Sequence, residues 1–394
     1  MNLETARGLL SPEGEQLLEE AASLQGSFLT RLTALRKHHP AEIAGAALDL
    51  LELRHRASKK FSRANRMFFT REALEQASSE VISTYRAERF PTDGRVLDLA
   101  CGIGGDTIGL AGRCFANAVD RDPVRVEMAQ RNLEVYGLAE RVTFICADVM
   151  EVALEADAAF LDPSRRSDGR RIVKLSQLSP PLEFIRKLSE AVPNCAVKLS
   201  PATDYSELGS LGGEIEFISE SGECKEALVW LGDFNTATRR ATVLPGRDSI
   251  VCEPVETIPV RLPGKYIYEP DPAVIRAHLV EHLAARIGAW KLDEQIAYLS
   301  SDSLVETPFG TPYGILDSLP FNLKALSRRL RTLDAGRVIV KKRGVPFEPR
   351  EIEQRLKTTG SRELIVIITR TSEKPHALIC IHARPAGDSS PSAE

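Results

Sequence analysis

The spacing of apolar positions changes three times along the chain, and each spacing predicts a different architecture. Over residues 1–88 the apolar positions recur at helical intervals with almost no strand signal, which predicts a helical region. Over 89–235 short apolar runs alternate with helical stretches, as in βαβ units around a parallel sheet. Over 236–385 short β-like runs and amphipathic helices predict an α+β domain. Residues 386–394 are rich in Pro and Ser, and we expect a flexible tail.

Several elements can be placed before any chemistry is considered. Asp122, Pro123 and Gly137 have the residue types of a helix cap, first position and stop, so they predict a helix between them. Apolar residues four apart predict one amphipathic helix over 275–287. The strands predicted in the middle region are 96–99, 116–119, 142–146, 158–161 and 196–199, with a closing hairpin from 215–218 and 227–231.

Composition narrows the class of protein. With 394 residues and 43% hydrophobic residues, the chain can bury several cores, but it has no apolar run near the roughly 20 residues of a membrane helix. Seven irregularly spaced cysteines, with no CxxC pair, predict a reducing compartment and neither disulfides nor a metal site. We therefore expect a cytoplasmic protein without a membrane or metal partner. A net charge of −4 means that any nucleic-acid contact must be local.

The strongest chemical signal is the stretch 96–111, where an apolar strand runs through a glycine-rich turn into a helix. Its glycines allow close backbone approach to a ligand, and the helix start offers free N–H groups. A dinucleotide fingerprint requires glycine at 107, where this chain has Thr107. The carboxylates of Asp98 and Asp106 would repel a pyrophosphate, but would attract the sulfonium and ammonium of S-adenosylmethionine (SAM). The charge pattern thus favours SAM over NAD.

Carboxylates also follow the next two strands. Asp120, at the end of the second, can accept hydrogen bonds from both ribose hydroxyls, and Asp148, after the third, can accept the adenine amino group beside the N–H of Val149. One such Asp alone could be a helix cap, but three at successive strand ends after a glycine loop favour a cofactor site. The predicted cofactor-binding residues are Asp98, Ala100, Gly102, Gly104, Asp106, Asp120, Arg121, Asp148 and Val149.

With these motifs, the stretch from about 90 to 235 resembles the class I SAM-dependent methyltransferases. The resemblance implies an α/β, seven-stranded Rossmann-like core with strand order 3-2-1-4-5-7-6 and an antiparallel last strand. It also implies that SAM lies across the carboxyl ends of the strands. We therefore expect this core between an N-terminal helical region and a C-terminal α+β domain.

After the fourth predicted strand comes Asp162-Pro163-Ser164-Arg165, which resembles the Asp/Asn-Pro-Pro-aromatic loop of methyltransferases that act on base nitrogens. The resemblance implies that Asp162 and the Pro163 carbonyl accept hydrogens from the target nitrogen, so catalysis is positioning and electrostatics. Ser164 and Arg165 depart from the pattern, which leaves the target atom open. The loop also resembles that of the uridine C5 methyltransferases, but Cys195 lies at the start of its strand and no Ser-Cys-Asn-Pro follows.

Three residues near this loop are candidates for substrate contact: Arg166, Lys198 and Ser200. The alternative interpretation of the last two is an ordinary polar pair at a strand end. Residues 54–71 carry seven cations and no acid, interleaved with Phe61, Phe68 and Phe69. That pattern suits an RNA surface, or else a helix with a solvated basic face and buried phenylalanines.

A second basic cluster ends in Lys341, Lys342 and Arg343, which we predict to contact substrate. This part of the chain resembles the THUMP-like domain behind a class I methyltransferase core in a bacterial family, and that resemblance implies structured RNA, usually tRNA. The sequence therefore predicts a SAM-dependent methyltransferase acting on a base nitrogen in tRNA or rRNA. A protein or small-molecule substrate, or a SAM- or RNA-binding module without catalysis, remains as an alternative. The oligomeric state stays open.

Overall fold

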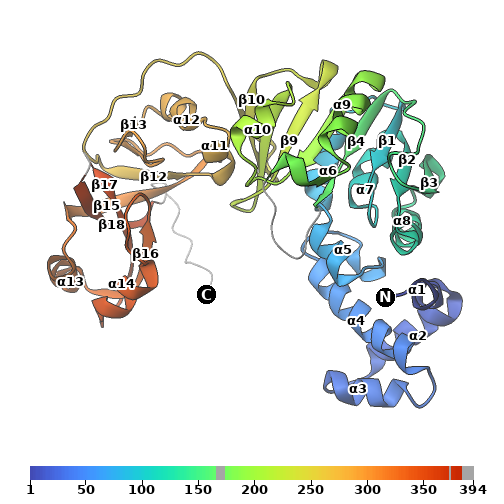
Figure 1. Cartoon of the computed structure of the whole chain (residues 1–394). Coiled ribbons are helices and arrows are strands. Elements are labelled where there is room, and N and C mark those ends of the chain that lie inside the picture. Colours follow the sequence, from blue (N-terminus) through green and yellow to red (C-terminus); the bar gives the residue numbers. More distant parts are fainter. Residues whose placement is uncertain (166–173, 372–373, 384–394) are drawn as a thin grey trace. The chain divides into compact units, whose positions relative to one another are not determined.

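The structure is a computed structural model that describes residues 1–165, 174–371 and 374–383 (Figure 1). It divides into two compact units, the first Met1–Ile218 with Lys225–Thr238 and the second Ser219–Cys224 with Arg239–Glu394. Each unit is described by itself. Among the described helices, none is both long and apolar enough to cross a membrane.

The N-terminal helices and the predicted methyltransferase core belong to the same unit. Leu17, Leu48 and Phe61 share one hydrophobic cluster with Met128 and Leu133 of α8 (Pro123–Tyr136). Figure 1 shows these helices, in blue, gathered on one side of the core. The other helices of this region are α1 (Leu3–Leu10), α2 (Pro12–Ser23), α3 (Phe28–Leu35), α4 (Ala41–Ala57), α5 (Arg71–Gln76) and α6 (Glu80–Ala87).

The sheet of the first unit confirms the class I order. Its strands follow one another as β8-β9-β7-β4-β1-β2-β3, with β1, β2, β3, β4 and β7 parallel and β9 antiparallel to β7. The four residues of β4, near the middle of this sheet, are apolar and all buried, as expected where helices cover a parallel sheet on both faces. Their bounds are β1 (Arg95–Leu99), β2 (Phe115–Asp120), β3 (Val142–Cys146), β4 (Ala158–Leu161), β7 (Cys195–Leu199), β8 (Glu214–Glu220) and β9 (Glu223–Leu231).

The helix between β1 and β2 brings an N-terminal helix close to the sheet. A Cβ at Gly109, in α7 (Gly105–Ala111), would lie 2.3 Å from the carbonyl oxygen of Ser83 in α6, so only glycine allows this contact. The predicted helix from Asp122 to Gly137 is confirmed as α8, capped by the Asp122 side chain. The remaining elements of this unit are α9 (Leu182–Ala191), α10 (Tyr205–Gly209), β5 (Ser164–Arg165) and β6 (Leu178–Ser179).

The second unit is an α+β domain around a mostly antiparallel sheet. The sheet order is β13-β14-β12-β15-β18-β17-β16, in which only the β16–β17 pair is parallel within the described strands. The helices α13 (Leu323–Thr332) and α14 (Pro349–Leu356) pack on one face through Leu326, Leu330 and Ile352. The strands of this sheet are β12 (Tyr266–Pro270), β13 (Trp290–Lys291), β14 (Leu299–Ser301), β15 (Gly310–Pro320), β16 (Ala335–Lys342), β17 (Arg362–Thr371) and β18 (Lys374–His382). Outside this sheet, β10 (Arg239–Leu244) pairs antiparallel with β11 (Asp248–Val251).

One prediction in this unit was wrong. The single helix expected over 275–287 is two helices, α11 (Pro272–Arg276) and α12 (Val280–Ile287). The chain turns at His278, whose φ of 55° is left-handed and cannot continue a right-handed helix. The apolar residues at spacings of four still face one core, since Leu279 and Leu283 are fully buried.

Candidate active site

The glycine-rich turn between β1 and α7 leaves room for a ligand at one glycine and allows close helix packing at another. Ala100, Gly102 and Gly104 all have positive φ, at 65°, 57° and 84°. A Cβ at Gly102 would meet no atom within 4 Å, so this side of the turn is open to a ligand. A Cβ at Gly104 would lie 2.8 Å from the Leu133 side chain, so that glycine allows α8 to pack closely.

The carboxylate of Asp120 is fixed to this turn. One oxygen accepts the N–H of Gly102 and the other accepts the N–H of Asp122, both at 2.9 Å. A carboxylate has about four lone-pair positions, so both oxygens can still accept from ribose hydroxyls. Arg121, which follows directly, is exposed.

The end of β3 lies beside the end of β2, as parallel pairing requires. The N–H of Ala147 donates to the carbonyl of Asp120 at 3.1 Å, and the side chain of Asp148 accepts the N–H of Met150 at 2.9 Å. Val149 is buried. The structure thus brings the predicted cofactor residues of three strands to one edge of the sheet.

Asp98 lies beneath the turn rather than on its surface. Only 1% of the residue is exposed, and its carboxyl accepts the hydroxyl of Thr107 at 2.5 Å, which joins β1 to α7. Thr107, where a dinucleotide-binding turn has glycine, is therefore the partner of this acid. Burial raises the pKa of Asp98 from 3.8 to about 7, against the opposing effect of the Thr107 hydrogen bond.

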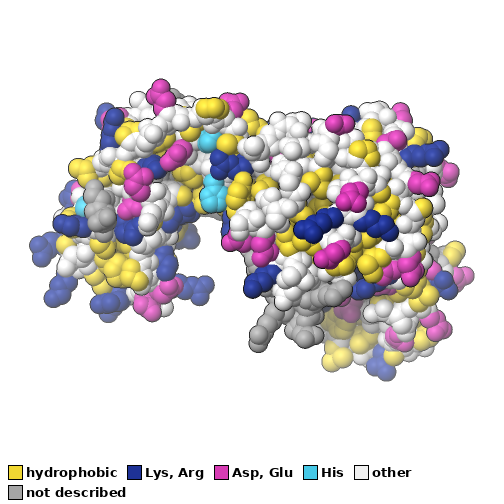
Figure 2. Space-filling model, turned by 45° about the horizontal axis from the view of Figure 1, so that its top comes forward, with side chains coloured by type: hydrophobic (Ala, Val, Ile, Leu, Met, Phe, Trp, Pro, Cys, Tyr) yellow, Lys and Arg dark blue, Asp and Glu magenta, His cyan; other side chains and the backbone are white. Residues whose placement is uncertain are grey.

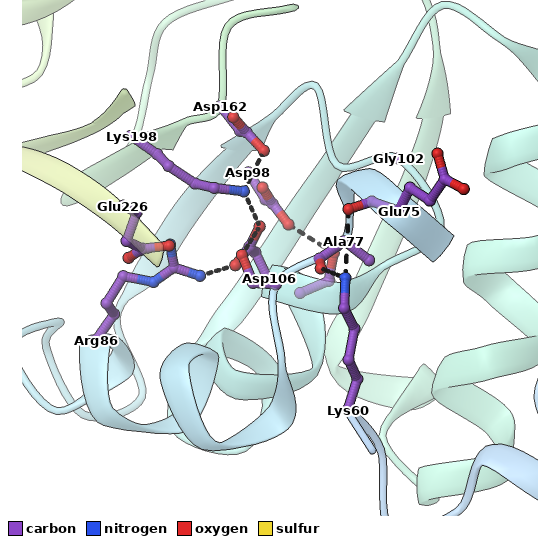
Figure 3. Close-up of polar contacts among 12 residues, drawn as sticks. Lys60, Glu75, Ala77, Arg86, Asp98, Gly102, Asp106, Asp162, Lys198 and Glu226 are labelled. Carbon is purple, nitrogen blue, oxygen red and sulfur yellow. Dashed lines mark hydrogen bonds and ion pairs between the residues drawn. The ribbon is translucent and has the colours of Figure 1, made fainter. Parts of the chain in front are cut away.

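A buried guanidinium that sequence reasoning missed lies next to this acid (Figure 3). Arg86 of α6 is 2% exposed, donates to both oxygens of Glu226 at 3.0 Å and pairs with Asp106. Its guanidinium also lies 4.6 Å from the ring centroid of Phe160 in β4. No local pattern could have identified it, because Arg86 and Glu226 are 140 positions apart in sequence.

Lys198 extends this network to the predicted catalytic loop. Its ammonium donates to one oxygen of Asp162 at 2.6 Å and lies 3.8 Å from Asp106. The N–H of Asp162 donates to the carbonyl of Leu99 at 3.2 Å, so the loop adjoins the glycine-rich turn. Lys198, which the sequence predicts to contact the substrate, thus has Asp162 as a hydrogen-bond partner.

The predicted catalytic loop begins with a partly exposed carboxylate and continues into a short strand. Asp162 keeps 31% of its side chain exposed, and within the described ranges its Oδ1 has no hydrogen-bond partner. Pro163 is buried, and the backbone of Ser164 and Arg165 forms β5, which pairs with β6. Arg166 lies outside the described residues. Ser200, at the end of β7, accepts the N–H of Ala202 at 3.2 Å.

In the basic segment 54–71, the phenylalanines and Lys60 contact other parts of the protein. Phe61, Phe68 and Phe69 are at most 3% exposed, so the alternative of buried phenylalanines is the one found, and no base can stack on them. Lys60 donates to three backbone carbonyls at the end of α5, those of Leu74, Glu75 and Ala77, at 2.7–3.3 Å (Figure 3). This holds the chain that leads to Ser78, whose hydroxyl lies 3.3 Å from Asp106.

The three cations predicted to contact substrate in the second unit have carboxylate neighbours. Lys341 donates to Glu269 at 2.5 Å and Lys342 to Glu348 at 2.6 Å. Arg343 lies 4.0 Å from Glu269. Across the described part of the chain, no group of three or more His, Cys, Asp or Glu side chains could hold a metal ion.

The pKa of Asp98 gives a stability prediction with a definite sign. Between about pH 4 and pH 7 the folded chain holds a proton on Asp98 that the unfolded chain has lost, so the free energy of unfolding falls as the pH rises through this window. From pH 5 to pH 8 the free energy of unfolding should fall by about 3 kcal/mol, since about 1.4 kcal/mol is lost for each pH unit below the folded pKa. Asp98→Asn should remove this fall, measured by urea unfolding at pH 5 and pH 8. Equal pH dependence in both proteins would contradict the prediction.

These residues suit a cationic cofactor. Carboxyl groups outnumber cations around the turn in the described structure, even with Asp98 protonated: Asp98, Asp106, Asp120, Asp162 and Glu226, with Arg86 and Lys198. A diphosphate would meet this excess of acid, whereas a sulfonium would be stabilised by it. Together with the class I sheet order, the site defines a SAM-dependent methyltransferase.

Comparison with known proteins agrees. Residues 93–195 match the family model for RNA cap guanine-N2 methyltransferases, residues 310–385 match a THUMP domain-like model, and residues 2–57 match a domain of unknown function. An uncharacterised S-adenosylmethionine-dependent methyltransferase of Mycobacterium tuberculosis, Rv3037c, is 37% identical over 330 residues, covering 81% of this chain and 90% of its own length. The chain belongs to this family of SAM-dependent methyltransferases.

Two further matches are more distant. The trimethylguanosine synthase of Schizosaccharomyces pombe is 30% identical over 130 residues, which cover 30% of this chain and 54% of the synthase. A crystal structure assigned as a methyltransferase from Porphyromonas gingivalis W83 superposes with a TM-score of 0.77 at 23% identity, covering 94% of this chain and 98% of that one. The latter confirms the fold alone.

Proposed function

We propose that the chain methylates a base nitrogen in structured RNA, either tRNA or rRNA. The observation that carries the proposal is the carboxylate of Asp162, which lies beside the cofactor turn with one oxygen held by Lys198 and the other without a described partner. The match of residues 93–195 to RNA cap guanine-N2 methyltransferases and of 310–385 to a THUMP-like domain supports RNA as the substrate.

The cofactor would lie across the ends of β1, β2 and β3. SAM supplies the methyl group from its sulfonium. The open side of Gly102 lets the backbone approach the cofactor, and Asp120 accepts hydrogen bonds from the ribose hydroxyls. Asp148 and the N–H of Val149 bind the adenine, while Ala100, Gly104, Asp106 and Arg121 shape the turn and its surroundings.

The catalytic loop would orient the nucleophile. Asp162 Oδ1 and the Pro163 carbonyl each accept one hydrogen of the target amino group, which aims its lone pair at the methyl carbon. As the nitrogen bonds to the methyl carbon, the bond from that carbon to the sulfonium sulfur would break, and the neutral thioether would leave. The nitrogen then carries an extra proton, which Asp162 is placed to accept. Lys198 acts as a positioning residue here, because its ammonium holds Asp162 Oδ2. Ser164 and Arg165 remain proposed catalytic residues of the same loop. The proposed substrate contacts are Arg166, Ser200, Lys341, Lys342 and Arg343.

The test is transfer of a tritiated methyl group from SAM to total RNA. We expect labelling of RNA from a strain that lacks the gene and none of RNA from its parent, whose sites are already modified. Mass analysis of the labelled nucleosides then identifies the atom. Label in the protein or small-molecule fraction of the same strain, with none in RNA, would overturn the RNA substrate but not the methyltransferase activity.

A further inference from the structure

The outer face of α13 carries a row of cations that lack acidic partners. Lys324, Arg328 and Arg331 are spaced by four and three residues, so they share one side of the helix, opposite the buried Leu326 and Leu330. All three are exposed, and within the described ranges none has a carboxylate within 4.0 Å. Among these three side chains, the only hydrogen bond within the described residues joins Arg331 to the Ser327 carbonyl at 3.4 Å.

Four other cations of this unit are paired, whereas Arg276, Arg350 and Arg355 resemble the α13 row in having no carboxylate partner among the described contacts. Lys291, Arg337, Lys342 and Arg370 each lie within 3.2 Å of a carboxylate. Figure 2 shows Lys and Arg side chains gathered over the part of this unit that α13 and α14 occupy in Figure 1. A row of cations without local acids is the pattern expected of a surface that neutralises phosphates.

A shallow hollow of about 340 Å³ adjoins this row, between β15 and α13. Leu319 and Ala325 give it apolar lining, and Arg328 of the cation row is also a lining residue. Asp317, also in its lining, pairs with Arg329 and accepts the N–H of Ser318 at 2.8 Å. The carboxylate disfavours a phosphate inside the hollow, whereas an uncharged ring can lie on the apolar surface beside a guanidinium.

We propose that this hollow and the α13 row form a second nucleotide-binding site, in which an unpaired base enters the hollow while the adjoining phosphates lie along Lys324, Arg328 and Arg331. The occupant is a single-stranded stretch of RNA, because the site combines phosphate contacts with a place for an exposed base. The inference rests on the proposed RNA substrate and assigns it a contact outside the methyltransferase core. An acidic lipid surface would need the cations but not the hollow.

The test uses the full chain and a fluorescein-labelled 12-nucleotide RNA of mixed sequence, with anisotropy measured over a salt series. Arg328→Glu should weaken binding at least fivefold and lower the slope of log K against log salt by about 0.7, the value for one phosphate of a single strand. Ala325→Phe, which fills the hollow, should weaken binding at least threefold and leave that slope unchanged. Arg276→Glu is the matched control, since Arg276 is exposed in α11 of the same unit, and it should bind as the parent does.

The outcomes separate this inference from the proposed function. If Arg328→Glu and Arg276→Glu weaken binding equally, or Ala325→Phe has no effect, the second site is overturned even where RNA is methylated. If vesicles with phosphatidylserine bind the parent chain and lose binding in Arg328→Glu, while the RNA does not bind, the surface is a membrane contact and the inference fails. Loss of RNA binding in both α13-site variants supports it, whether or not methyl transfer is detected.

Discussion

Replacing Asp162 by alanine should reduce methyl transfer by at least about 100-fold and leave SAM binding within about threefold of the parent. The carboxylate contributes orientation and proton acceptance, each of which acts on the reacting nitrogen and neither on the cofactor. Its contact with the turn is made by its backbone N–H, which alanine keeps. Single-turnover transfer of tritiated methyl to RNA from the gene-deletion strain measures the rate, and titration calorimetry measures SAM binding.

Two variants make this prediction specific. Asp162→Asn keeps one oxygen acceptor and should retain more activity than Asp162→Ala, but it cannot take the proton. Asp233→Ala removes an exposed carboxylate elsewhere in the first unit and should change neither quantity. Loss of SAM binding in Asp162→Ala, or transfer at the parent rate, would contradict the assigned role.

The second large effect concerns stability. Arg86→Met should lower the free energy of unfolding by about 3–5 kcal/mol, because it leaves Glu226 buried without its hydrogen-bonded cation and Asp106 with only Lys198, 3.8 Å away. Methionine has a similar length and no charge, so the loss would not come from a cavity. Urea unfolding at pH 7 measures it.

The double variant Arg86→Met with Glu226→Gln provides the control. It removes the Glu226 carboxylate, which Arg86→Met leaves without its guanidinium partner, and should recover part of the stability lost by Arg86→Met alone, as expected for groups in one network. Burial raises the pKa of Glu226, so the Arg86→Met defect should also shrink as the pH falls and the carboxyl takes a proton. A loss below about 1 kcal/mol would mean that the network is not held by its charges.

Much of the core could be predicted from sequence, because its signals are local. The five parallel strands, the closing hairpin and the helix from Asp122 to Gly137 all lie where apolar runs and capping residues placed them. The long strand β15 was missed, since it contains Pro312 and two glycines and ends in Pro320, residues that usually argue against a strand.

The roles of single side chains were harder to predict. Lys198 and Ser200 have the same position in the sequence pattern, at the end of β7, yet only Lys198 reaches Asp162. The phenylalanines near residue 60 alternate with cations as an RNA surface would, but they are buried in the core shared with α8. In both cases the deciding neighbour is far away in the chain.

Alone, then, the sequence determined the class of protein: residue spacing specifies which elements form, and the glycine turn followed by acids at strand ends specifies a cationic cofactor. Only the tertiary structure decided which hydrogen-bond donor or cation each of those acids binds. Asp98 turns to Thr107, Asp106 to Arg86, and Asp162 to Lys198. The physical reason is that a buried carboxylate must find a hydrogen-bond donor or a cation, and packing of distant elements chooses which one.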